Sequence, residues 1–329
     1  MSETARAPEA PLRETRPPGA SEREPARAGD ARPAAGRDKM GSRQDFTAAD
    51  GWLTRTDLIS RSIYWGIHGV ALGVFVTGAP ASAVALCAAT YLVRVFAITG
   101  AYHRYFSHKG YKTSRAFQFV LAFIGASATQ KGPLWWAATH RRHHRYSDQP
   151  GDPHSPKEGF WYAHQGWIFD ARWGGTNLEA VRDFARYPEL VWLNQYHFVA
   201  PLTLAALCWA VGGAAGLVWG FAVSTTLLWH ATYSINSLAH LWGTRRYETS
   251  DTSRNNLLLA IVTLGEGWHN NHHHYMASAR NGFKWWEIDV TYYVLRALAA
   301  VGLVWDLREP PASVVRGRAA GAADVPGTA

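Results

Sequence analysis

Charged residues are missing from two long stretches of this 329-residue sequence. No Asp, Glu, Lys or Arg occurs from Ser62 to Val93 or from Leu190 to Thr244. A helix that crosses a bilayer needs about 20 apolar residues, so the second stretch is long enough for two such helices and the first nearly so. With 47% hydrophobic and only 18% charged residues, the composition argues against a soluble globular protein and indicates a membrane protein.

Cysteine is also scarce. The two cysteines, Cys87 and Cys208, both fall inside apolar stretches. They exclude a disulfide framework or a thiolate metal site, and we interpret them as small buried hydrophobic residues. The net charge of +8 lies in tails and loops, which indicates membrane topology and attraction to lipid head groups rather than nucleic-acid binding.

The ends of the chain lack apolar material. No aromatic residue precedes Phe46, so we expect residues 1–50 to be disordered, because they cannot bury enough apolar surface. They contain no apolar core of the signal-peptide kind, and we expect no cleavage. Residues 308–329 have a similar composition, which leaves an ordered domain over 51–307.

Within this domain we expect four transmembrane helices in two hairpins. Neither hairpin turn contains Lys or Arg, whereas the tails and the middle segment contain many. The positive-inside rule therefore predicts that both termini and the middle segment lie in the cytoplasm. The predicted fold class is an all-α membrane protein with a cytoplasmic helical cap. The predicted transmembrane helices cover about 62–77, 81–101, 198–211 and 217–238.

Histidine is unusually frequent, with 15 residues, and much of it is grouped. Positions i, i+3 and i+4 share a helix face, so the histidines of the second group, and those of the third, are predicted to converge. The first group is spaced i, i+5 and does not share a face on an ideal helix, so each member could reach a different metal ion. The groups are His103 and His108; His140, His143 and His144; and His269, His272 and His273, with His240 alone.

Neutral imidazole is a good ligand for iron, copper, zinc and nickel. Isolated histidines such as His68, His164, His197 and His230 are interpreted as ordinary buried or surface residues. The grouped histidines would repel one another if they were protonated without a metal. They also exceed the ligands that one zinc ion takes, so the sequence predicts two metal ions.

Five stretches together resemble a known family, the membrane-bound histidine-box fatty acyl desaturases, and within it the stearoyl-CoA or acyl-CoA Δ9-desaturase group. The resemblance extends from about Leu58 to Trp305. The matching stretches are HRYFSH, HRRHHRYSD followed by GDPHS, NSLAH, GEGWHNNHHHY, and WWEIDVT starting at Trp285.

The resemblance implies a non-haem centre of two Fe²⁺ ions that uses O₂ and two electrons from an external donor. It implies insertion of a cis double bond, at Δ9, into a saturated long-chain acyl-CoA. His274 has no counterpart among the ligands, and Asn236 matches a position that holds one metal through a water. The implied ligands are His103, His108, His140, His143, His144, His240, His269, His272 and His273.

Other residues have predicted secondary roles. Trp135 and Trp136 precede the second histidine group and either line a narrow acyl tunnel or belong to an interfacial aromatic belt. Glu266 and Asp152 lie beside histidine groups, and they either accept hydrogen bonds from imidazole N–H groups or are ordinary surface carboxylates. For both residue pairs the sequence leaves the two interpretations open.

The substrate head group depends on a basic site. The animal acyl-CoA enzymes that the chain resembles carry a basic pair after the Gly-Trp that follows the second histidine group. Here Arg172 remains, while Asp170 and Ala171 bring no positive charge. We therefore expect Arg172 to contact the CoA phosphates, with an acyl chain esterified in membrane lipid as the alternative substrate.

We find neither a cytochrome b5-like haem segment nor a Gly-rich dinucleotide fingerprint in the given sequence. We therefore expect a separate ferredoxin or cytochrome b5-like donor with its reductase. Arg141, Arg142 and Arg145 would suit an acidic donor. Two other functions stay open: a fatty acyl hydroxylase, which differs by small displacements in the site, and a histidine-rich metal carrier. A carrier would place histidines and carboxylates within its spans, whereas these histidines cluster at the cytoplasmic ends.

Overall fold

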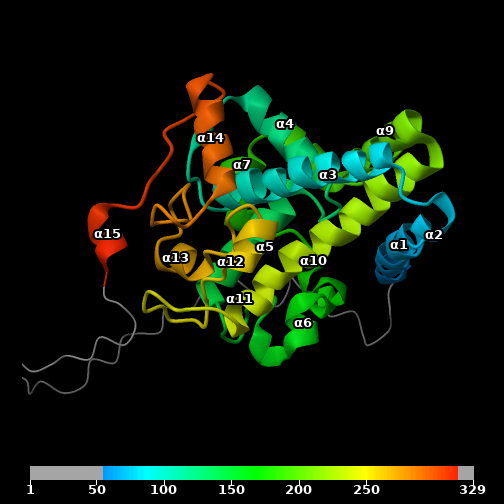
Figure 1. The fold of residues 1–329 in the computed structure, drawn as a ribbon. Coiled ribbons are helices and arrows are strands. Elements are labelled where there is room, and N and C mark those ends of the chain that lie inside the picture. Colours follow the sequence, from blue (N-terminus) through cyan, green and yellow to red (C-terminus); the bar gives the residue numbers. More distant parts are fainter. Residues whose placement is uncertain (1–54, 318–329) are drawn as a thin grey trace, which may run out of the picture. The chain divides into compact units, whose positions relative to one another are not determined.

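The computed structural model describes residues 55–317 of the chain. The predicted N-terminal tail over 1–50 lies outside the described residues. The described part is mostly helical (Figure 1), in agreement with the all-α expectation, and adds one short sheet. In this sheet β1 (Lys112–Thr113) pairs antiparallel with β2 (Val304–Trp305), with Lys112 opposite Trp305.

Three helical stretches of the described residues are long and apolar enough to cross a membrane: Leu58–Thr77, Ala81–Ser107 and Val199–Leu241. They include the sites of all four predicted helices. Their elements are α1 (Arg55–Ala71), α2 (Val74–Thr77), α3 (Ala81–Phe96), the π-helix η1 (Ala97–Ser107), α9 (Val199–Gly216), the π-helix η6 (Leu217–Val223), α10 (Ser224–Asn236) and α11 (Leu238–Leu241).

The third stretch reverses direction at Gly213, whose φ of 56° and ψ of −142° suit glycine. Its two arms then pack closely. A Cβ added at Gly216 would lie 2.2 Å from the Cys208 carbonyl oxygen, and one at Gly220 would lie 2.9 Å from the Cys208 Sγ. The two arms coincide with the predicted helices at 198–211 and 217–238.

The remaining elements lie mostly between and after these stretches. Several begin at a capping residue that the sequence supplies: Ser114 accepts a hydrogen bond from the Phe117 N–H, and Asp289 accepts one from the Tyr292 N–H. They are α4 (Arg115–Ala126), α5 (Pro133–Tyr146), α6 (Phe160–His164), α7 (Arg182–Ala185), α8 (Pro188–Gln195), α12 (Leu257–Val262), α13 (His269–His274), α14 (Val290–Ala300), α15 (Ala312–Arg316), and the 3₁₀ turns η2 (Pro156–Glu158), η3 (Gly166–Phe169), η4 (Ala171–Trp173) and η5 (Glu179–Val181).

The predicted C-terminal tail begins too early. The Arg308 N–H donates to the Gly110 carbonyl at 2.8 Å, and the Tyr247 hydroxyl donates to the Val315 carbonyl at 2.9 Å. The ordered domain therefore extends through α15, because backbone groups of residues 308–317 find partners on it that composition does not reveal.

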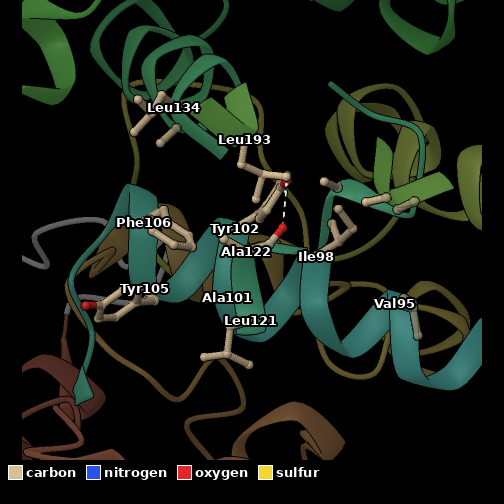
Figure 2. Close-up of a cluster of buried hydrophobic side chains, with 14 of the residues drawn as sticks. Val95, Ile98, Ala101, Tyr102, Tyr105, Phe106, Leu121, Ala122, Leu134 and Leu193 are labelled. Carbon is tan, nitrogen blue, oxygen red and sulfur yellow. Dashed lines mark hydrogen bonds between the residues drawn. The ribbon is translucent and has the colours of Figure 1, made fainter. Parts of the chain in front are cut away.

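The core is built around η1, which packs against α4 and α5, while α8 packs against α4 and α5 in turn. Figure 2 shows Tyr102 between these elements, with its hydroxyl donating to the Ala122 carbonyl at 3.3 Å. This packing fixes η1, which ends at the first histidine group, beside α5, which carries the second. The labelled core residues are Val95, Ile98, Ala101, Tyr102, Tyr105, Phe106, Leu121, Ala122, Leu134 and Leu193.

The closest approach in this core is at Gly125 of α4. A Cβ there would lie 2.3 Å from the Cε1 of the fully buried Tyr102 ring. Gly125→Ala is therefore expected to lower the free energy of unfolding by about 1–3 kcal/mol through overpacking. Thermal unfolding of the purified protein in detergent measures this. Gly69→Ala is the control, since nothing lies within 4 Å of its Cβ; equal midpoints for the two variants would contradict the prediction.

Candidate metal centre

Five histidines, from α5, α13, and η1 with the residue that follows it, bring their ring nitrogens together in what we call cluster A. Their ligand atoms all lie within 4.8 Å of one another. The Nε2 atoms form a chain of short contacts: His103 to His272 at 3.0 Å, His272 to His144 at 3.0 Å, His144 to His140 at 2.9 Å and His140 to His108 at 3.0 Å. Cluster A consists of His103, His108, His140, His144 and His272.

Four more histidines form cluster B, and all four are buried. The His240 Nε2 lies 3.0 Å from the His269 Nε2. The two clusters are adjacent, because the ring centroids of His144 in cluster A and His273 in cluster B are 4.5 Å apart. Cluster B consists of His143, His240, His269 and His273.

The spacing of the first histidine group suggested that its two members could reach different metal ions. The structure instead places both in the same cluster. His103 and His108 both lie in cluster A. The reason is the π-helix η1, in which the hydrogen bonds join residues five apart. The His108 N–H donates to the His103 carbonyl at 3.2 Å, so the i, i+5 spacing places both side chains on one face.

The second and third groups do divide, contrary to the expectation that each converges. In α5, His140 and His144 belong to cluster A, whereas His143 belongs to cluster B. In α13, His269 and His273 belong to cluster B, whereas His272 belongs to cluster A. The i, i+4 pair stays together in each helix, and the third histidine is rotated toward the neighbouring cluster.

The contacts within cluster A fit a cation better than hydrogen bonds. An imidazole Nε2 carries either one hydrogen or one lone pair, so a chain of four Nε2–Nε2 contacts cannot consist of four hydrogen bonds. Burial, with the neighbouring imidazoles adding to it, lowers the pKa of His108, His140, His144 and His272 well below its usual value. These rings are therefore neutral, as metal ligands must be.

Cluster B gives the same indication. Burial lowers the pKa of His269 well below the usual value and, against the opposing effect of Asp251, lowers that of His273 to about 4. The His273 Nε2 is buried without a hydrogen-bond partner among the described residues. A metal ion would satisfy this nitrogen, so the donor set of each cluster could hold one ion.

Carboxylates contact the Nδ1 nitrogens of several of these rings. Glu266 Oε2 lies 2.5 Å from the His103 Nδ1, and Asp152 Oδ1 lies 2.9 Å from the His143 Nδ1. Of the two interpretations that the sequence left open for Glu266 and Asp152, these contacts match the one in which each carboxylate is the partner of an imidazole. The sequence interpretation missed Asp148, 3.3 Å from the His240 Nδ1, and Asp251, 2.6 Å from the His273 Nδ1.

A largely apolar cavity of about 1180 Å³ reaches the clusters. Trp135, Trp136 and Asn236 all line it, together with His140. Trp136 stacks on the His140 ring with centroids 4.9 Å apart. The cavity then continues along α10, η6, α1 and α9, past residues such as Ile67, Ala205, Leu217, Phe221 and Ala222.

One polar link, which the sequence interpretation missed, crosses the cavity wall beside the clusters. The Gln130 side-chain amide donates to the Thr232 hydroxyl at 2.8 Å, and the Trp136 indole N–H donates to the Gln130 Oε1 at 3.2 Å. These bonds join α10 to α5 and hold Trp136 against His140. In the sequence, only the proximity of Gln130 to the second histidine group points to this role.

The basic residues proposed for the substrate and the donor are engaged within the protein. Arg172 donates to both Asp170 oxygens, with a shortest distance of 2.6 Å, and to the Tyr162 hydroxyl at 3.0 Å. Arg141 binds both Asp183 oxygens at 2.9 Å. Arg172 remains half exposed, whereas Arg141 is mostly covered.

Three of the isolated histidines form a chain of their own. The His68 Nε2 lies 3.2 Å from the His230 Nε2, and the His230 Nδ1 lies 3.0 Å from the His164 Nε2. The chain ends at the Ser237 hydroxyl, 3.0 Å from the His164 Nδ1. Each contact joins two atoms in series, and these rings belong to none of the converging groups among the described residues, so we interpret them as hydrogen-bonded structural residues.

Two adjacent histidine clusters thus lie beside a largely apolar cavity, in a protein with three helical stretches that are long and apolar enough to cross a membrane. The family model described as fatty acid desaturase matches residues 79–307. The chain therefore belongs to the fatty acid desaturase family.

Curated relatives include both lipid-linked and CoA-linked enzymes. The chain is 40% identical over 240 residues to "Delta-9 acyl-lipid desaturase 1" of Arabidopsis thaliana, covering 71% of this chain and 77% of the relative. It is 39% identical over 232 residues to "Acyl-CoA C20 Delta5-desaturase" of Anemone leveillei, covering 68% and 73%. It is 40% identical over 234 residues to "Palmitoyl-monogalactosyldiacylglycerol delta-7 desaturase, chloroplastic" of Arabidopsis thaliana, covering 69% of this chain but only 62% of that relative.

Proposed function

We propose that the protein is an O₂-dependent desaturase that inserts a cis double bond at Δ9 into a saturated long-chain fatty acyl substrate. The observation that carries the proposal is the long, largely apolar cavity that reaches His140 of cluster A and Asn236. Such a cavity suits an alkyl chain, which offers no polar group to recognise except at its head.

Each cluster is proposed to hold one iron ion, with Asn236 contacting one of the two ions through a water. The iron pair would supply the chemistry that removes two hydrogens from adjacent methylenes, using O₂, two external electrons and two protons and releasing two waters. The chain's own residues position the substrate: Trp136, held by Gln130, forms the wall against His140. Burial of the clusters excludes bulk water and side reactions.

The membrane arrangement follows from the charge pattern. We infer that the two arms on either side of Gly213 cross separately, which gives four crossings together with the stretches Leu58–Thr77 and Ala81–Ser107. Both termini and the clusters then lie on the cytoplasmic side, where a ferredoxin or a cytochrome b5-like protein with its reductase would deliver electrons. The proposed contacts for an acidic donor are Arg141, Arg142 and Arg145, of which Arg141 also pairs with Asp183.

The proposed substrate form is the acyl-CoA, with the acyl-lipid as the second candidate. CoA carries several phosphate charges, and the exposed Arg172 can exchange a carboxylate for a phosphate. Each exposed contact of this kind contributes about 0.2–1 kcal/mol. The acyl-lipid is favoured by the pairing of Arg172 with Asp170 and, at 3.7 Å, with Glu158, which already neutralises its charge.

A fatty-acid profile tests the proposed function. The gene is expressed in a desaturase-deficient host, and the lipids are examined by gas chromatography with mass spectrometry. A new cis-Δ9 monounsaturated acid supports the proposal. Hydroxylated acids would identify a hydroxylase, and unchanged lipids together with metal accumulation would identify a metal carrier; either result would refute the proposal.

The head group is tested with the purified enzyme, a reduced donor and O₂, supplied with either stearoyl-CoA or a stearoyl phospholipid. Turnover of the CoA ester is expected, with a severalfold rise in KM for Arg172→Ala and at high salt, because the contact is exposed and screened. Arg182→Ala is the matched control, since this arginine is exposed and pairs with Glu179 at 3.3 Å on the protein surface. Turnover of the phospholipid alone would reject acyl-CoA.

A further inference from the structure

The outward-facing nitrogens of the two clusters have different partners. In cluster B, three of the four rings face a carboxylate through Nδ1: His143 and Asp152, His240 and Asp148, and His273 and Asp251. In cluster A, the only carboxylate within 4 Å of a ring nitrogen, among the residues that the structure describes, is Glu266 at His103. The Nδ1 atoms of His144 and His272 are buried without any hydrogen-bond partner there.

The carboxylates also differ in their other partners. Glu266 accepts hydrogen bonds from the Arg104 Nε at 3.1 Å and Nη2 at 2.9 Å, so its charge is shared with a guanidinium. Asp148 accepts from the Thr252 N–H and hydroxyl, both at 2.6 Å. Asp251 accepts from the Ser253 N–H at 3.0 Å. These neutral donors leave the negative charge of each aspartate available to its imidazole.

Exposure adds a second, independent difference. All four rings of cluster B are buried, whereas His108, His140 and His144 of cluster A are only half-buried. A chelator or a water molecule therefore reaches cluster A more easily. Cluster A has one more imidazole than cluster B, but among the described residues only its His103 ring faces a carboxylate.

An imidazole whose Nδ1–H donates to a carboxylate is oriented and made more basic at Nε2, and losing such a partner typically lowers metal affinity roughly 10–100-fold. We propose that the two metal sites hold their ions unequally, so that cluster B retains its ion while cluster A releases its ion first. Asp148, Asp152 and Asp251 are positioning residues that act through His240, His143 and His273. The inference rests on the proposed function in one respect, namely that both clusters bind metal.

The test follows metal release from the full-length protein in detergent, loaded with Fe²⁺ under anaerobic conditions. A coloured ferrous chelator in excess reports the release over time. The wild-type protein is expected to release its two ions in two phases of equal amplitude, with rates at least about tenfold apart. A single phase for both ions would overturn the inference. Fewer than two ions per chain at the start would instead contradict the proposed di-iron centre.

Substitutions assign the phases to the clusters. Asp251→Asn is expected to accelerate the slow phase roughly 10–100-fold and to leave the fast phase unchanged. Glu266→Gln should accelerate only the fast phase. Asp306→Asn, at an exposed pair with Lys112, is the matched control and should alter neither. Acceleration of the fast phase by Asp251→Asn would overturn the inference.

Single-site proteins provide an assignment that does not depend on the carboxylate variants. His108→Ala in cluster A is expected to leave one ion that departs at the slow wild-type rate. His269→Ala in cluster B is expected to leave one ion that departs at the fast rate. The opposite pairing of variant and rate would overturn the inference even if the carboxylate variants failed to fold.

Discussion

Replacing any one histidine of cluster A or cluster B with alanine is expected to abolish desaturation. Each ring supplies one coordination bond to the ion of its cluster, and the loss of one ligand leaves that ion incompletely held. Expression in a desaturase-deficient host, followed by fatty-acid profiling, should show no monounsaturated product. Metal analysis of each purified variant should show the loss of about one of two ions.

Histidines outside the clusters are the controls. The His274 ring stacks on Tyr247, with centroids 4.2 Å apart, and contributes to neither cluster, although it directly follows His273. His274→Ala should therefore keep its activity and its metal, as should His197→Ala. His240 provides the sharpest check, because it stands alone in the sequence. Normal activity and full iron content in His240→Ala would show that the proposed ligand set is wrong.

The sequence predicted which histidines gather, because local spacing marks them. His140, His143 and His144 occupy one turn of a helix, and the same holds for His269, His272 and His273. Apolar length likewise located the membrane helices, since a bilayer imposes a minimum span that can be read directly from the sequence. Both kinds of information lie within a few consecutive residues.

The division of the histidines between the two clusters could not be predicted in this way. It depends on the rotation of each helix about its own axis, which tertiary packing sets. In η1 it also depends on π-helical hydrogen bonding, whereas the interpretation assumed an ideal α-helix. The close fit of Tyr102 against Gly125 is one of the contacts that fix this rotation, and it joins residues that no local pattern connects.

The carboxylates show the same limit. Asp152 and Glu266 were identified as candidates because they lie beside histidine groups in the sequence. Asp251 was missed because it lies far from its partner His273 along the chain, in a polar loop without a distinguishing motif. The cavity was anticipated only at Trp135 and Trp136, since its other walls come from helices that lie far apart in the sequence.

The length of the cavity predicts a second substitution with a large effect on activity. Its wall along η6 and α10 runs from Leu217 to Asn236, roughly 29 Å at the α-helical rise. Ala222 lies on this wall, faces the cavity and is fully buried. Ala222→Trp is expected to fill the cavity and to abolish conversion of an 18-carbon chain, while both metal ions remain bound because the clusters lie at the other end of the wall.

The smaller Ala222→Val should act in the same direction with a weaker effect, shifting the product toward shorter chains, since it adds volume without blocking the cavity completely. Ala85→Trp is the matched control: Ala85 lies on α3 with an exposed side chain and does not line the cavity, so its product profile should equal that of the wild type. The measurements are product chain length by gas chromatography and iron per chain in each purified variant. If Ala222→Trp folds with two ions and still converts the 18-carbon chain at the wild-type rate, the acyl chain does not occupy this cavity, because an indole at position 222 leaves no room for it there.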